Sequence, residues 1–210
     1  MPDVDTDEDV LARIGIRIDD TTAGHLQAAC ARIARRIHAD KLRVVGFVPS
    51  DDTVAVPPVA IHLGLALCSL TGATIGVVDA NVRYPALAEL SKGQPIDHTG
   101  SRSAGHDRDH SVFATRWLRG SLALLTPPRV ERAGEVVPQL ARVLLESADL
   151  FAHVLVDLTG FELLGEHASA AACMDAVALV SRAHRSRERE LVELAQLMPH
   201  GRFLGVLLVG

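Results

Sequence analysis

Two aspartates stand where short apolar runs end, and they are the residues of this sequence best placed to do chemistry. Asp79 follows Gly76-Val77-Val78, and Asp157 follows Val154-Leu155-Val156. A carboxylate at the carboxyl end of a parallel strand faces the ligand crevice of an open α/β sheet, where it can hold Mg²⁺ or orient a nucleophile. Aspartate is also a favoured helix N-cap, and both residues precede turns. Asp79 and Asp157 are therefore candidate catalytic residues and metal ligands, with capping as the alternative.

The elements that must position these carboxylates follow from the hydrophobic pattern. Apolar runs predict strands over residues 42–48, 74–79, 122–125, 154–157, 176–180 and 203–209. Helical periodicity predicts helices over residues 23–39, 57–70, 84–90, 136–148, 162–173 and 187–198. Strands that alternate with helices indicate βαβ units and a mainly parallel sheet. Only 3% of residues are aromatic, so the core must be aliphatic, which is typical of an α/β fold whose sheet is covered by helices.

The chain of 210 residues suits one domain with a short extension. Residues 1–22 are acidic and predict a flexible or loosely docked tail, and residues 23–210 form the domain. Residues 91–115, rich in Gly, Ser, His and Asp, predict a long polar surface loop.

Charge and cysteine usage exclude several function classes. The net charge of -5 argues against a generally basic nucleic-acid binder. Three scattered cysteines argue against a disulfide framework and for reduced thiols, so we expect a cytoplasmic protein. Residues 1–9 are acidic, unlike a signal peptide, and no apolar run approaches the roughly 18 residues of a membrane span.

The segment Val77-Val78-Asp79-Ala80-Asn81-Val82-Arg83-Tyr84-Pro85-Ala86-Leu87 resembles a motif of known enzymes. It is similar to the second acidic motif, Asp-Ala-Asp-Leu-Arg-x-Pro-x-Leu, of the bacterial tyrosine kinases that control capsule and exopolysaccharide synthesis. These kinases are deviant P-loop ATPases, related to septum-positioning and chromosome-partition ATPases. Phe151 to Asp157 resembles their Walker B strand. The resemblance covers nearly all of residues 23–210 and implies a P-loop NTPase-like three-layer sandwich.

The phosphate loop departs from that family. Where the kinases carry Gly-x-Gly-Lys-Ser/Thr-Thr, this sequence has residues 53–58, Thr-Val-Ala-Val-Pro-Pro. Val56 stands in place of the lysine that neutralises phosphate charge, and Pro57 in place of the hydroxyl that binds Mg²⁺. Pro57 and Pro58 have no N–H to donate to a phosphate, and Asp51 adds negative charge. The degenerate cofactor site comprises Asp51, Thr53, Val56, Pro57, Pro58, Asn81 and Arg83.

These departures predict a relative of the kinases that has lost ATP chemistry. Asn81 replaces the second aspartate of the acidic motif, and Tyr84 is the sole tyrosine, so we expect no tyrosine-rich tail of the kind that these kinases phosphorylate. We expect no bound cofactor and a regulatory or binding module in polysaccharide production. By resemblance, its partner is the cytoplasmic part of a membrane polysaccharide co-polymerase, which would bring it to the inner face of the membrane, or an active kinase paralogue. The alternatives are an active kinase or ATPase using ATP and Mg²⁺, and a partition-type ATPase relative.

Three further features are weighed against ordinary surface roles. His98, His106 and His110 accompany aspartates in the polar loop, and His106-x-x-x-His110 has metal-ligand spacing, although such loop residues are usually solvated. Arginines at 182, 185, 187 and 189 alternate with glutamates, which favours a salt-bridged helix face over nucleic-acid binding. The kinases oligomerise through Glu-x-x-Arg-x-x-Arg, and Ala29 replaces that glutamate here, so we leave homo-oligomerisation open.

Overall fold

The computed structural model describes residues 6, 9, 11–12, 16, 23–83, 113–128, 130 and 132–209. Seven strands form one sheet in the order β3-β4-β2-β5-β1-β6-β7. The strands are β1 (Val44–Pro49), β2 (Ile75–Asp79), β3 (Ala114–Leu118), β4 (Leu122–Thr126), β5 (His153–Asp157), β6 (Ala176–Arg182) and β7 (Phe203–Val209). The helices are α2 (Ala23–Ala39), α3 (Pro57–Thr71), α5 (Val136–Ser147), α6 (His167–Ala172) and α7 (Glu188–Gln196), with short 3-10 turns η1 (Ala133–Glu135) and η2 (Phe161–Leu164).

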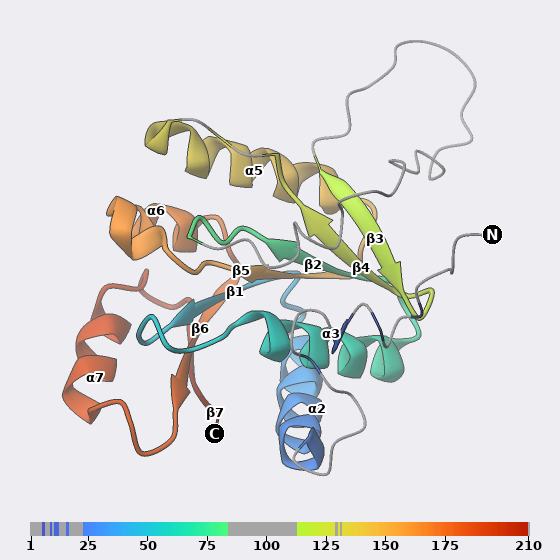
Figure 1. The fold of residues 1–210 in the computed structure, drawn as a ribbon, viewed down its shortest axis with the longest axis horizontal. Coiled ribbons are helices and arrows are strands. Elements are labelled where there is room, and N and C mark those ends of the chain that lie inside the picture. The colour runs from blue at the N-terminus through green and yellow to red at the C-terminus, as the bar shows by residue number, and fades with distance from the viewer. Residues whose placement is uncertain are drawn as a thin grey trace.

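The helices cover both faces of the sheet, which gives the three layers that the resemblance implies (Figure 1). On one face α2 and α3 enclose a cluster of aliphatic side chains with Phe47. On the other face α5, α6 and part of α7 enclose a second cluster that contains Phe151 and Phe161. All neighbouring strands run parallel except β3, which pairs antiparallel with β4.

Helix α3 illustrates how the sequence builds an element that lies deep in the molecule. Pro57 and Pro58 open it at positions where the missing N–H costs nothing, and Gly72 ends it in the left-handed conformation with its N–H bonded to the Cys68 carbonyl. The helix is apolar around most of its circumference, because it lies between the sheet and α2.

The main correction to the predicted elements is strand β3. We expected residues 91–115 to be loop, but Ala114 and Thr115 begin an edge strand. This strand lies at the edge of the sheet, where it pairs antiparallel with β4 and exposes Trp117. Its residues therefore do not form the continuous apolar run from which strands were predicted. The predicted helix at 162–173 is likewise wrong as one element, because Gly165 adopts a left-handed conformation and separates η2 from α6. The predicted helix at 84–90 lies outside the described residues.

Two residues of the predicted N-terminal tail pack against the domain. Leu11 and Ile16 are 1% and 2% exposed and belong to the α2–α3 cluster, so the tail is docked onto the core at these two positions. The Ile16 amide donates to the Leu11 carbonyl over 2.9 Å. The apolar residues among positions 10–18 are the signal in the sequence for this docking.

Candidate functional site

Asp79 and Asp157 lie side by side at the carboxyl edge of the sheet. Strands β2 and β5 are parallel neighbours, and their register pairs Asp79 directly with Asp157. Neighbouring strands are about 4.8 Å apart, so the two side chains begin within contact distance of each other. Their side chains are buried, with 3% and 2% of the residue exposed. Two acidic side chains predicted at separate strand ends therefore form one acidic pair.

The environment of Asp157 opposes its ionisation. Burial raises the pKa of Asp157 to about 7, and the charge of Asp79 also raises it. Hydrogen bonds from Thr159 act in the other direction: the Thr159 amide and hydroxyl donate to Asp157 Oδ1 over 2.9 and 2.5 Å. Asp157 Oδ2 is buried without a hydrogen-bond partner of ordinary geometry in the described part of the chain, although the Asn81 side chain is near enough to lower the pKa. At neutral pH the pair therefore carries less than two full negative charges.

The loop after β2 packs against the loop after β5. The Asn81 amide donates to Asp79 Oδ1 over 3.3 Å, and Asn81 Oδ1 accepts the Arg83 amide over 2.9 Å. The Val82 amide donates to the Thr159 carbonyl over 3.1 Å. Sequence analysis missed Thr159 as a site residue; its signal was the Asp-x-Thr spacing, which allows the aspartate to accept both donors of the threonine.

In the loop between β1 and α3, where the kinases bind phosphate, the Asp51 carboxylate accepts hydrogen bonds from the loop itself. Asp51 Oδ1 accepts the Thr53 amide over 2.8 Å and the Thr53 hydroxyl over 2.5 Å. The Val54 amide donates to the Asp51 carbonyl over 3.3 Å. The hydrogen bond from the Thr53 hydroxyl is the main reason that the pKa of Asp51 lies below its usual value. Asp51 thus accepts hydrogen bonds from the kind of donors that a phosphate loop offers to an anionic ligand.

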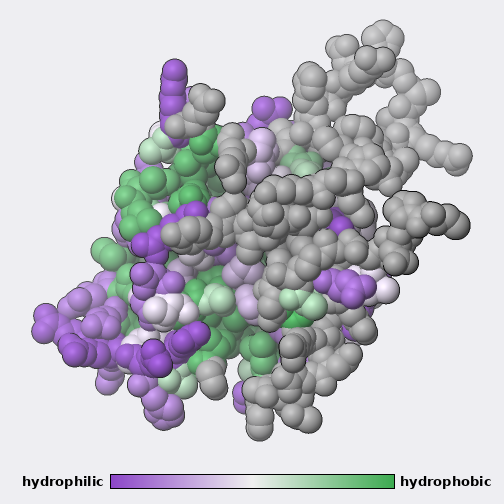
Figure 2. Space-filling view, viewed as in Figure 1, coloured by the Kyte–Doolittle hydropathy of each residue, from purple (hydrophilic) through white to green (hydrophobic). Residues whose placement is uncertain are grey.

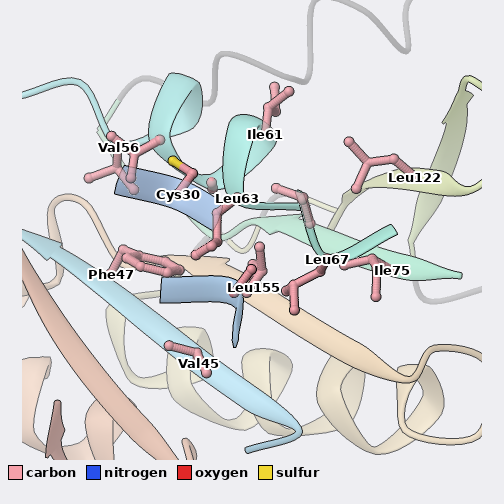
Figure 3. Close-up of a cluster of buried hydrophobic side chains, with 14 of the residues drawn as sticks. Cys30, Val45, Phe47, Val56, Ile61, Leu63, Leu67, Ile75, Leu122 and Leu155 are labelled. Carbon is pink, nitrogen blue, oxygen red and sulfur yellow. The ribbon is translucent and has the colours of Figure 1, made fainter. Parts of the chain in front are cut away.

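Val56 points into the core and not toward a ligand. Its residue is 0% exposed, and it belongs to the same cluster as Cys30, Phe47 and Leu63 (Figure 3). Pro57 and Pro58 follow it at the first turn of α3 and supply no N–H. Val56, which the resemblance places at the kinase lysine, is therefore a packing position in this chain.

Two further contacts tie the β1–α3 loop to its neighbours. Arg83 Nη1 lies 3.8 Å from Asp52 Oδ2, which joins the β2 loop to the β1–α3 loop. The Ser50 hydroxyl lies 3.0 Å from that of Ser186, which accepts from the Ser181 hydroxyl over 2.6 Å. These contacts link the loops after β1, β2 and β6.

The residues present do not fit a triphosphate, and they fit Mg²⁺ only in part. Carboxylates at Asp79 and Asp157 are ligands that Mg²⁺ accepts, and the unpartnered Asp157 Oδ2 is an oxygen that a cation or its water could satisfy. Pro57 provides no hydroxyl ligand, and Val56 no positive charge for the phosphates that normally complete the coordination. Whether Asp79 and Asp157 bind a metal stays a prediction.

A pocket of about 470 Å³ opens beside Asp79, on the face of the sheet that α5 covers. The loop after β2, the loop after β4, the start of α5 and η2 enclose it. Asn81 and Arg83 line this pocket, whereas Asp51, Thr53 and Val56 do not. The predicted cofactor residues are thus divided between two places.

The remaining predicted surface sites have different outcomes. His98, His106 and His110 lie outside the described residues, and the described part of the chain holds no cluster of three metal-ligating side chains. Arg189 pairs with Glu193 over 2.8 Å on α7, and Figure 2 shows hydrophilic side chains gathered over this helix. No helix in the described ranges has the length and apolar character needed to cross a membrane.

Comparison with solved structures identifies the architecture. The BceF tyrosine kinase domain matches with a TM-score of 0.67 at 18% identity, over 96% of this chain and 81% of that one. The kinase domain of the Escherichia coli tyrosine kinase ETK matches with a TM-score of 0.67 at 16% identity, over 96% and 79%. This chain has the fold of the bacterial tyrosine kinase domains.

That shared fold confirms the P-loop NTPase-like sandwich predicted from sequence. A ParA family ATPase from Chlorobium tepidum is also similar, with a TM-score of 0.53 at 16% identity over 80% of this chain and 72% of that one. No protein-family model and no curated protein sequence matches the chain. At these identities the similarity establishes the bacterial tyrosine kinase fold, and the chemistry must be argued from the residues.

Proposed function

We propose that this chain is a catalytically degenerate relative of the polysaccharide-biosynthesis tyrosine kinases and acts as a binding or regulatory module. The observation that carries the proposal is the β1–α3 loop, in which the Asp51 carboxylate accepts the Thr53 amide and hydroxyl. A bound phosphate would have to displace this carboxylate and approach Asp52 as well, without a lysine to offset the charge. Each charge-assisted hydrogen bond lost costs about 1.5–3 kcal/mol, so the missing lysine, hydroxyl and amides together remove most nucleotide affinity.

By its resemblance to the kinases, the module would bind the cytoplasmic part of a membrane polysaccharide co-polymerase or an active kinase paralogue. The tyrosine kinase domains that share its fold support the relationship to kinases on which this part of the proposal rests. The hydroxyl contact between Ser50 and Ser186 joins the loops after β1 and β6, which supports a partner surface built from these loops.

A second candidate is an active ATP-dependent kinase or ATPase with an unorthodox phosphate loop. The observation that favours it is the acidic pair, in which a buried Asp157 Oδ2 lacks an ordinary hydrogen-bond partner in the described structure. Under this alternative Asp79 and Asp157 hold Mg²⁺, and Asp157→Asn abolishes turnover. Under our proposal the same variant keeps its partner.

Isothermal titration with ATP·Mg²⁺ tests the proposal directly. We expect no binding in the micromolar range, and micromolar affinity would contradict the proposal.

The variant Val56→Lys is a second test, because a loop that lacked only its lysine would regain ATP binding. We expect Val56→Lys to lower the thermal midpoint by burying a charge, and to gain no affinity. The exposed change Ala55→Lys is the matched control and should leave the midpoint nearly unchanged.

A further inference from the structure

The pocket beside Asp79 combines an apolar floor with a basic rim. Phe161, Leu140 and Val136 form part of the floor and are 1%, 2% and 9% exposed, so the second core cluster holds them in place. Arg83 and Arg132 also line the pocket, with side chains that are 30% and 83% exposed. A volume of about 470 Å³ falls within the roughly 300–1,000 Å³ of small-molecule sites.

Both arginines can be recruited by a ligand at small cost. Arg83 Nη1 is 3.8 Å from Asp52 Oδ2, and Arg132 Nη1 is 3.8 Å from Glu135 Oε1. The two carboxylate side chains are 66% and 53% exposed, and ion pairs of this length at a surface contribute at most about 1 kcal/mol. A ligand anion seated at the pocket would offer each guanidinium a shorter, more desolvated partner.

The shape of this site separates the two parts of a ligand. The partly exposed side chains of Pro127, Val130 and Leu164 also line the pocket and offer apolar surface against which an apolar body can pack. Asp79 lies at the β2 side of the lining and repels an anion, so the charged group must face the arginine rim. Hydrophobic side chains also gather over α6 and the neighbouring end of α5 on the face shown in Figure 2.

We propose that the pocket lined by Phe161, Arg83 and Arg132 binds a small amphiphilic anion, whose apolar ring enters the pocket while its carboxylate or phosphate pairs with the two arginines. The proposal does not depend on the function proposed above. It concerns the α5 face of the sheet, whereas nucleotide binding concerns residues 50–58. An ATP complex at the β1–α3 loop would contradict the proposed function and leave this site intact.

The test is a titration of the full chain, followed by ¹⁵N–¹H correlation spectra. Phenyl phosphate and benzoate are the two probes, which distinguish a phosphate from a carboxylate head group. Inorganic phosphate and benzyl alcohol each lack one half of the ligand. We expect at least one of the two probes to shift the amides of Val82, Ala133 and Val136, and both half-ligands to bind at least about tenfold more weakly.

Three variants decide which contacts matter. Arg132→Ala and Arg83→Ala should each weaken binding of that probe about tenfold, because each removes one charge-assisted partner. Ala133→Trp keeps both arginines, fills the pocket from an exposed position, and should abolish binding. Arg142→Ala is the matched control: Arg142 lies on α5, pairs with Glu146 over 3.5 Å, and is not part of the lining.

Several results would overturn the proposal. The proposal is wrong if neither probe binds at millimolar concentration. It is also wrong if inorganic phosphate or benzyl alcohol binds as tightly as the probes. Unchanged affinity in Ala133→Trp would place the ligand elsewhere. An effect of Arg142→Ala equal to that of Arg132→Ala would mean that the anion responds to overall charge and not to this rim.

Discussion

At the residue scale, the acidic pair gives this protein its most unusual electrostatics. Asp79 and Asp157 are partners in adjacent strands, both buried, and Thr159 donates two hydrogen bonds to Asp157 Oδ1. These donors do not offset the loss of water, because the pKa of Asp157 still rises to about 7. At neutral pH a proton therefore offsets part of the negative charge of this pair.

This raised pKa predicts a stability that falls as pH rises. The folded state holds the Asp157 proton up to about pH 7, whereas the unfolded chain releases it near 3.8, so unfolding becomes easier across that window. The full shift corresponds to a cost on the order of 4 kcal/mol above the window. We expect Asp157→Asn to raise the free energy of unfolding at pH 7.5 and to flatten its decline between about pH 4 and pH 7.

Urea denaturation at several pH values measures this effect. Asp149→Asn changes an exposed aspartate just after α5 and should leave the pH profile as it is. A loss of stability in Asp157→Asn at pH 7.5 would show that the ionised carboxylate is stabilised by a partner, such as a bound cation.

At the element scale, the loops after β2 and β5 pack closely against each other at Gly160. Gly160 has a φ of +89°, and a Cβ built there would lie 2.7 Å from Val82 Cγ2 and 3.2 Å from the Arg83 amide nitrogen. The Val82 amide also bonds to the Thr159 carbonyl. The site therefore depends on close backbone approach between two loops that are distant in sequence.

Gly160→Ala should separate these loops. It combines a left-handed strain of about 1 kcal/mol with a clash, so we expect a loss of about 2–4 kcal/mol in unfolding free energy. Gly120→Ala is the matched control, because Gly120 has a φ of +70° but nothing within 4 Å of the added Cβ. Chemical denaturation of both variants isolates the clash from the strain. Equal losses would mean that the two loops do not constrain each other.

At the scale of the whole molecule, the core extends beyond the predicted domain. Leu11 and Ile16 lie in the α2–α3 cluster, although they belong to the segment expected to be a tail. Burial of each aliphatic side chain contributes about 1.5–3 kcal/mol, so these two residues matter to a domain of ordinary stability.

The double variant Leu11→Ala with Ile16→Ala should therefore lower the free energy of unfolding by about 3–6 kcal/mol. The matched control is Ala12→Gln, which changes an exposed residue between them and should have little effect. Thermal unfolding followed by circular dichroism measures both. A double variant as stable as the control would show that the segment does not contribute to folding in solution.

The sequence predicted the parts of the fold that depend on local pattern. Helix α2, helix α5 and strand β7 fall within a residue of their predicted bounds, because periodicity and runs of aliphatic residues are local properties. Strand β3 could not be predicted in this way, since a five-residue edge strand with Arg116 at its centre acquires its identity by pairing to β4.

The order of residues also predicted which side chains stand at the strand ends and, through the resemblance to the kinases, a phosphate loop without its lysine, glycines and hydroxyl. Folding in three dimensions was needed to show that Asp79 and Asp157 are paired and that Val56 is buried. The physical reason is that strand order and register join residues about 80 positions apart, and a linear pattern carries no signal for such pairing. The arginine-rimmed pocket arises in the same way, from four segments that only folding brings together.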